Sequence, residues 1–114
     1  YSSAIKQAWT APAAGKLNTM RIIFHASDTG LTDPFKFYVY KGTVANNTSS
    51  TVLTLIATSS TCTPIASRTM LISDDFSSGN TFSANDTLSI WLKKDSTSGN
   101  QDIFMNVTLM GEYT

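Results

Sequence analysis

Cysteine is almost absent from this sequence, and that scarcity limits how the chain can be stabilised. The single cysteine, Cys62, cannot form a disulfide within the chain, so stability has to come from packing and from association between chains. The neighbouring residues, Thr61 and Thr63, carry no positive charge that would lower the pKa of the thiol. We therefore expect Cys62 to be structural and not catalytic.

Charge is also scarce, at 14% of residues against about 25% in a typical soluble domain. Eight basic and eight acidic residues cancel, so no long-range field attracts nucleic acid or anionic lipid. No apolar run approaches the roughly 20 residues needed to span a bilayer. We expect neither nucleic-acid binding nor membrane insertion. The chain begins at Tyr1 without a signal-like segment, which we interpret as a processed terminus or a fragment boundary.

Helical periodicity is missing as well, because no stretch keeps a helical spacing of apolar residues over three turns. Short alternating stretches separated by turn-forming residues recur instead, and the abundant Thr packs well on pleated sheets. We predict eight strands, at Ala4–Trp9, Lys16–Ala26, Phe35–Gly42, Thr51–Ser59, Ser67–Ser73, Thr81–Phe82, Thr87–Lys93 and Asp102–Tyr113.

Eight short antiparallel strands are best closed as two packed sheets, because a single open sheet would leave its core face in water and both edges free. The sequence therefore predicts one all-β domain over residues 1–114, an antiparallel two-sheet sandwich of jelly-roll type. An immunoglobulin-like sandwich is the alternative, although the cysteine pair common in that fold is missing.

Large apolar side chains also alternate onto the face opposite the predicted core, where a monomer would expose them. Such surface favours association, and Trp and Tyr are enriched in interface cores. Our candidates for an oligomer interface or a ligand platform are Tyr38, Tyr40, Trp91, Phe104 and Met110. The alternative is that these side chains are buried within one chain. Thr51–Ser59 is apolar on both faces, which predicts a central or interface strand.

Catalytic chemistry has little support in the sequence. His25 is the only histidine and lies in the middle of a predicted strand, so we expect a surface or interface residue and not a general base. The adjacent Asp74 and Asp75 would diverge in an extended chain, which disfavours paired-carboxylate catalysis. A calcium site from Asp28, Asp33 or that pair matches no known loop pattern. We predict no catalytic residues, cofactor or metal.

Two stretches resemble a known class of domain: Trp9-Thr-Ala-Pro-Ala-Ala-Gly-Lys-Leu17 and Phe82-Ser-Ala-Asn-Asp-Thr-Leu-Ser-Ile90, each leading into a strand. Together with the final Gly111-Glu112-Tyr113, they resemble small jelly-roll domains of tailed-phage virions, which occur in tail fibres, head fibres and capsid decoration proteins. The layout is also similar to trimeric jelly rolls of the complement-C1q and tumour-necrosis-factor type. Where such domains tend to have Gly before the Asp, this chain has Asn85, which also tolerates positive φ.

The resemblance implies a non-enzymatic structural or attachment domain on a virion surface, assembled as a homotrimer and contacting other virion proteins, a host receptor or a glycan. Loops carry binding residues more often than scaffolds do, so we expect partner contacts at Ser27–Pro34, Val44–Ser50 and Asp74–Asn80. The loop candidates are Asp28, Asp33, Asn46, Asn47, Asp74 and Asp75. The alternative function is a secreted carbohydrate-binding module in which Tyr38, Tyr40 and Trp91 stack on sugar rings. An enzyme is the third hypothesis.

Overall fold

The computed structural model of the chain describes residues 3–26, 33–42, 52–94 and 103–114. Within these residues there are eight strands and no helix. They are β1 (Ser3–Thr10), β2 (Gly15–Ala26), β3 (Phe35–Gly42), β4 (Thr54–Thr58), β5 (Thr69–Asp75), β6 (Thr81–Phe82), β7 (Thr87–Lys94) and β8 (Ile103–Tyr113). All eight predicted strands are present, and most of their ends lie within two residues of the prediction.

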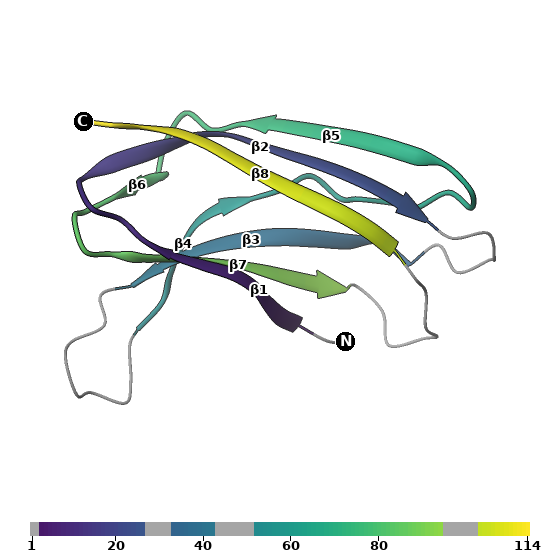
Figure 1. The fold of residues 1–114 in the computed structure, drawn as a ribbon, viewed down its shortest axis with the longest axis horizontal. Helices are drawn as coiled ribbons and strands as arrows, with labels where there is room; N and C mark the ends of the chain where they lie inside the picture. Colours follow the sequence, from purple (N-terminus) through teal and green to yellow (C-terminus); the bar gives the residue numbers. More distant parts are fainter. Residues whose placement is uncertain (1–2, 27–32, 43–51, 95–102) are drawn as a thin grey trace.

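The strands form two sheets that face each other as two layers (Figure 1). Sheet A has the order β1-β7-β3-β4. In sheet B, β2 pairs with β8 on one side and with β5 and β6 on the other. All these pairings are antiparallel, and most connections cross from one layer to the other. The predicted all-β, two-sheet antiparallel sandwich of about eight strands is confirmed.

The core lies between the layers and follows the predicted alternation. Alternate residues of β2, β3 and β7 are buried, among them Met20, Ile22, Phe24, Phe35, Phe37, Val39, Leu88 and Ile90. The rings of Phe24 and Phe35 meet edge to face at 5.4 Å between centroids, and those of Phe35 and Phe37 do so at 5.8 Å. Because fully burying each such side chain contributes about 1.5–3 kcal/mol, this interlayer core is the main source of stability.

One long side of the sandwich is closed by the connection from β4 to β5. Ser60, which follows β4, donates to Asp74 of β5 through its backbone N–H at 2.8 Å and through its hydroxyl at 2.6 Å. The backbones of Cys62 and Phe35 exchange two hydrogen bonds, at 2.8 and 2.9 Å. These bonds tie sheet B to sheet A along this side, and Cys62 is buried behind them.

At one end of the sandwich, the two stretches that carry the resemblance pack against each other. Ala11 donates to the carbonyl of Asp86 at 2.8 Å and accepts from the N–H of Asn85 at 2.7 Å. Asn85 has a φ of 71°, as expected for a residue that replaces Gly in a turn. The rings of Trp9 and Phe82 meet edge to face, with centroids 6.2 Å apart. We name this end of the molecule the corner.

Two glycines allow β2 to approach its neighbours closely near the corner. A Cβ on Gly111 would lie 2.5 Å from the carbonyl oxygen of Lys16, and a Cβ on Gly15 would meet the carbonyl oxygen of Glu112 and the ring of Phe82. Backbone atoms of paired strands cannot move aside without breaking the ladder. Both positions therefore require glycine.

Thr51–Ser59 is predicted to be a central or an interface strand. The central position is wrong, because among the described strands β4 pairs only with β3 and forms an edge of sheet A, while the interface role stays a prediction. The register shifts where Val39 and Tyr40 of β3 meet β4. This irregularity buries both Ile56 and Ala57, while Leu55 remains 45% exposed. The apolar residues on both faces reflect this bulge and the exposed edge, because bulges interrupt strict alternation.

We expect Gly111→Ala to lower the free energy of unfolding by about 1–3 kcal/mol, the usual cost of overpacking a close contact. Urea denaturation followed by circular dichroism measures the change. Gly79→Asn is the matched control, because Gly79 has a positive φ of 68° but open space around it, and Asn tolerates that conformation. Equal effects of the two substitutions would contradict the assignment of a tight contact to Gly111.

Candidate interaction surfaces

The outer face of sheet A carries three aromatic side chains that contact one another. Tyr38 and Tyr40 of β3 stack with ring centroids 6.5 Å apart, and Tyr40 meets Trp91 of β7 edge to face at 6.1 Å. All three are partly buried. The Trp91 indole N–H donates to the Ser89 hydroxyl at 2.9 Å, which fixes the orientation of its ring. We call Tyr38, Tyr40 and Trp91 the aromatic cluster.

Lys93 completes the aromatic cluster with a positive charge. Its ammonium lies 4.6 Å from the centroid of the Tyr38 ring and 5.6 Å from that of Tyr40, and it donates to the Tyr40 hydroxyl at 3.1 Å. A cation over aromatic rings contributes about 0.5–2 kcal/mol, depending on exposure. The interplanar angle of 80° between Tyr40 and Trp91 means that these rings share no common plane. The cluster therefore combines two nearly parallel tyrosine rings, with an interplanar angle of 23°, with a perpendicular indole ring and the Lys93 ammonium.

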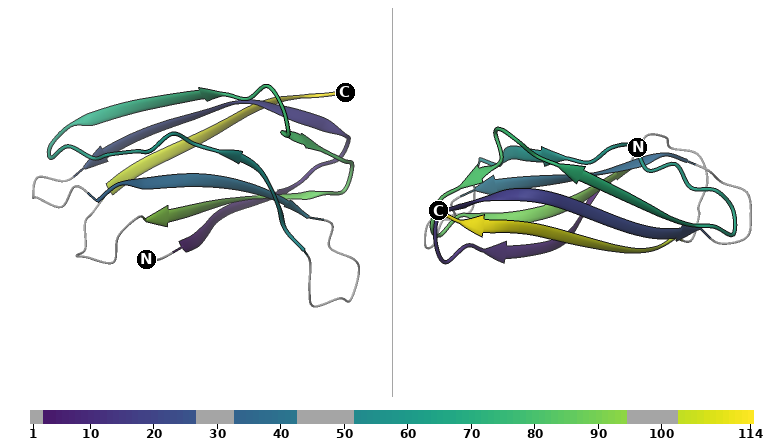
Figure 2. Two further views of the ribbon diagram at one scale, coloured as in Figure 1. Left: turned by 180° about the vertical axis from the view of Figure 1, so that it is seen from behind. Right: turned by 90° about the horizontal axis from the view of Figure 1, so that it is seen from above.

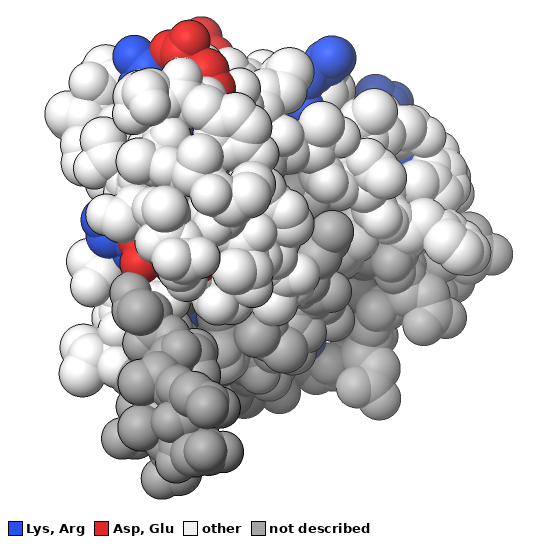
Figure 3. Space-filling model, turned by 60° about the vertical axis from the view of Figure 1, so that its left-hand side comes forward, with Lys and Arg blue, Asp and Glu red and all other residues white. Residues whose placement is uncertain are grey.

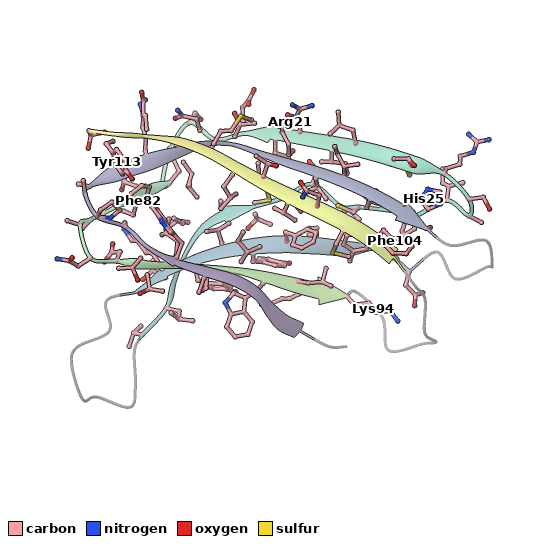
Figure 4. All side chains as sticks on the ribbon, in the orientation of Figure 1. Arg21, His25, Phe82, Lys94, Phe104 and Tyr113 are labelled. Atoms are coloured by element: carbon pink, nitrogen blue, oxygen red, sulfur yellow. The ribbon has the colours of Figure 1, made fainter. Side chains whose placement is uncertain are left out.

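The outer face of sheet B carries a second group of apolar side chains, and these are well exposed. Ile23 of β2 lies opposite Leu71 of β5, and Phe104 of β8 pairs with His25, two residues along β2 from Ile23. The exposed fractions are 46% for Ile23, 53% for Leu71 and 75% for Phe104. Arg21 projects from the same face, away from sheet A (Figure 4). Leu71, Ile23 and Phe104 form an apolar band across the three strands.

The five apolar candidates from the sequence are thus divided between two opposite surfaces. Tyr38, Tyr40 and Trp91 come together on sheet A, whereas Phe104 and Met110 belong to β8 in sheet B. Ile23 and Leu71 were not among the candidates. The alternation in Ser67–Ser73 places Leu71 opposite Met70 and Ile72, and this signal was present in the sequence. Ile23 lies between Ile22 and Phe24 in a continuous apolar run. The sequence therefore does not show which of these side chains points outward.

A groove opens between the layers on the side opposite the β4–β5 connection. β1 is the edge of sheet A and β8 is the edge of sheet B, and both lie along this side (Figure 2). The groove has a volume of about 490 Å³. Its apolar lining includes Trp9, Leu17, Phe82, Leu88, Val107 and Leu109. Trp9 is 44% exposed and Tyr113 is 58% exposed at its margin, so the core is open to solvent here.

Three of the acidic loop candidates have partners within the chain. Asp33 lies 3.0 Å from the ammonium of Lys94, and Asp75 accepts a hydrogen bond from the Thr19 hydroxyl at 2.8 Å. Asp74 binds Ser60, as described above. Asp74 and Asp75 belong to β5, so the expected loop Asp74–Asn80 is wrong at its start. The other candidates, Asp28, Asn46 and Asn47, lie outside the described residues, as do most of the loops Ser27–Pro34 and Val44–Ser50.

The two side chains with nucleophile or base chemistry lie in different surroundings. His25 is on the outer face of sheet B, where its Nδ1 is 2.9 Å from the Thr69 hydroxyl. Cys62 is buried, and burial raises the pKa of its thiol to about 11, with Asp74 contributing a smaller increase and a hydrogen bond with Ser59 opposing it. The neutral thiol is therefore favoured, as expected for a structural cysteine.

Within the described parts of the chain, no three side chains of His, Cys, Asp or Glu gather as a metal site would require. The described residues also contain no helix that is long and apolar enough to cross a membrane. Comparisons with models of known protein families, with curated proteins and with solved structures gave no match.

Cys62 offers a test of the closed side of the sandwich. At pH 8 a thiol reagent should modify it about 100-fold more slowly in the folded protein than in urea, because a rise of the pKa from 9.0 to about 11 lowers the thiolate fraction to that extent. Stability should also fall as the pH rises above 9, because the unfolded chain then ionises its thiol first. Equal reaction rates in the folded and unfolded protein would show that this side is open.

Proposed function

We propose that this chain is a non-enzymatic structural domain of a virion surface, a fibre, attachment or capsid decoration domain that works as a homotrimer. The observation that carries the proposal is the apolar content of both outer sheet faces, combined with the scarcity of charge. A solitary soluble domain normally covers its outer faces with charged side chains, and apolar surface left in water favours association. The virion setting follows from the resemblance in the stretches 9–17 and 82–90.

The aromatic cluster is the best candidate for the buried centre of the trimer contact. Interface cores are depleted in charge and enriched in Trp and Tyr, which bury large areas at a small cost in side-chain entropy. Tyr38, Tyr40 and Trp91 are already ordered by their mutual contacts, by Ser89 and by Lys93. Because these rings have little freedom left to lose, a partner surface binds them at a reduced entropic cost.

Electrostatics are compatible with close packing of several copies. The sequence has no net charge, and Figure 3 shows that most of the visible face carries neither basic nor acidic side chains. Copies with no net charge approach each other without the long-range repulsion that keeps highly charged proteins apart, and the Lys93 ammonium of each copy interacts with its own tyrosine rings. The domain would then present its remaining surfaces to other virion proteins or to a host receptor or glycan.

A first test is the mass of the protein in solution by multi-angle light scattering at micromolar concentration. We expect assemblies built from trimers. Trp91→Ala should shift them towards monomers, because a central interface aromatic contributes about 2 kcal/mol or more to binding. Leu71→Ala is the control, because it removes an exposed apolar side chain from the outer face of sheet B, in the opposite layer from the aromatic cluster, and should leave the trimer contact intact. A protein that is monomeric at all concentrations would contradict the proposal.

The alternative, a carbohydrate-binding module, uses the same aromatic residues. The variant Trp91→Ala also distinguishes it from the trimer. A glycan array with the unaltered protein identifies any sugar that binds. Loss of that binding in Trp91→Ala with an unchanged mass would favour the module, since the ring would then contact sugar and not a second copy. We expect the opposite result, a changed mass, because the perpendicular rings of Tyr40 and Trp91 provide no shared plane on which a sugar ring can stack.

A further inference from the structure

Strand β8 is a long edge without the features that normally prevent edges from pairing. It has 11 residues, and its one partner among the described strands is β2. Proteins protect such edges with lysine, proline, bulges or short strands. β8 contains no lysine or proline. Its only charged residue, Glu112, lies 3.1 Å from the ammonium of Lys16 on its partner strand.

The other long sheet edges have those features. β1 has a register irregularity between Ile5 and Gln7 and contains Lys6. β4 has five residues. β5 ends in Asp74 and Asp75. Among the described edge strands, β8 is therefore the longest and the one that carries none of these features.

The inner face of β8 is incompletely covered. Its inward residues Met105, Val107 and Leu109 pack against the core but remain only partly buried. In β2, the neighbouring strand of the same sheet, Met20, Ile22 and Phe24 are at most 1% exposed. Val107 and Leu109 line the groove between β1 and β8, and among the described strands none lies beyond β8 on that side. A strand added at this edge would extend sheet B and cover these side chains.

The outer face of β8 is complementary to itself when two copies run antiparallel about a twofold axis at Val107. In this register, residues whose numbers add to twice 107 lie opposite each other. Phe104 then faces Met110 of the second copy, and Asn106 faces Thr108. Phe104 and Met110 are 75% and 41% exposed in the single chain. The pairing would cover both, and cross-strand pairs of this kind contribute to sheet stability.

The inner face fits the same register, because Met105 then lies opposite Leu109 of the second copy. Moving the axis by one residue removes the match. An axis at Asn106 places Phe104 against Thr108, and an axis at Thr108 places Phe104 against the charged Glu112. The axis at Val107 thus pairs apolar with apolar and polar with polar on both faces.

We propose that β8 of one copy pairs antiparallel with β8 of a second copy about a twofold axis at Val107. The two sheets B become one continuous sheet, and the partner is a second copy of this chain. This contact goes beyond the trimer proposed above and uses a different surface. Alone it gives dimers. In combination with the trimer contact it gives hexamers where the twofold and threefold axes cross at right angles, and larger closed assemblies at other crossing angles, so closed assemblies made through β8 contain even numbers of chains.

Disulfide trapping tests the register directly. In the variant Phe104→Cys with Met110→Cys, the two new cysteines are six residues apart on one strand, about 20 Å, which is too far for a bond within the chain. In the proposed register each faces its counterpart in the second copy. We expect a covalent dimer on a non-reducing gel after mild oxidation. Cys62 is buried. Adding Cys62→Ser to the same variant excludes any covalent dimer formed through this native cysteine.

The matched control for trapping is Phe104→Cys with Thr108→Cys, whose cysteines face each other only if the axis lies at Asn106. It should give at least tenfold less covalent dimer. Absence of a covalent dimer in the first variant, with circular dichroism showing a folded protein, would overturn the proposal. Equal trapping of both variants would do the same, because random collision would then explain the bond.

Charge substitution tests the contact without oxidation. Asn106→Lys with Thr108→Lys places lysines against lysines across the axis, so we expect loss of even-numbered assemblies by light scattering. The corresponding double aspartate variant should behave likewise, and mixing the two should restore the even-numbered species, because opposite charges then face each other. Ser77→Lys with Ser78→Lys adds the same charge at two exposed positions outside both the aromatic cluster and β8 and should leave the mass unchanged.

The mass measurements separate this proposal from the proposed function. Trimers without any larger even-numbered assembly would overturn the β8 contact and leave the trimer proposal standing. Dimers without trimers would support the β8 contact and contradict the trimer. Failure of the lysine and aspartate variants to associate when mixed, although each is folded, would overturn the register with its axis at Val107.

Discussion

The close approach of β2 to β8 and β6 near Gly15 is the constraint on which the rest of the sandwich depends. At this point β2 has a paired strand on both sides, because Gly15 pairs with Tyr113 of β8 on one side and with Phe82 of β6 on the other. The absence of a Cβ lets the Phe82 ring occupy the space beneath the strand, where it meets Trp9 of the opposite layer. The corner thus fixes the spacing of the two layers, and the alternation along each strand then determines which side chains reach the core.

Alternation was sufficient to predict the strands and most of the core, because the side-chain period of a strand is two wherever pairing is regular. Met20, Ile22 and Phe24 were assigned correctly for this reason. Side chains are assigned to the wrong face where strand pairing is irregular or where apolar residues follow one another directly in the sequence. The bulge opposite Val39 buries Ile56 and Ala57 together, and no sequence pattern shows on which strand a bulge will occur. Which strands share a sheet is likewise decided by contacts between distant segments, so the division of the apolar candidates between two surfaces could not be read from the chain.

The acidic residues illustrate the same limit for the candidate site. Asp74 and Asp75 belong to a segment rich in Ser and Gly, and composition alone suggests an exposed loop. The register of β5 instead places Asp74 beside Ser60 and Asp75 beside Thr19, where each accepts a hydrogen bond. An exposed carboxylate binds partners through its free lone pairs, but one that already accepts from a neighbouring hydroxyl contributes to holding strands together. Tertiary pairing thus gives these residues structural contacts that composition does not reveal, and their role in partner binding stays a prediction.

The sandwich has one closed and one open long side, and this asymmetry relates the fold to the proposed assembly. On one side the connection from β4 to β5 spans the two layers and is held to them by hydrogen bonds. On the opposite side the edges of both sheets run free beside an apolar groove. A partner packed on a sheet face gains mainly apolar burial, which does not define a register. A partner strand at an edge must also match hydrogen bonds and alternation, and a shift by one residue turns every side chain to the wrong face. The face can therefore supply affinity, while the edge supplies a defined geometry between copies.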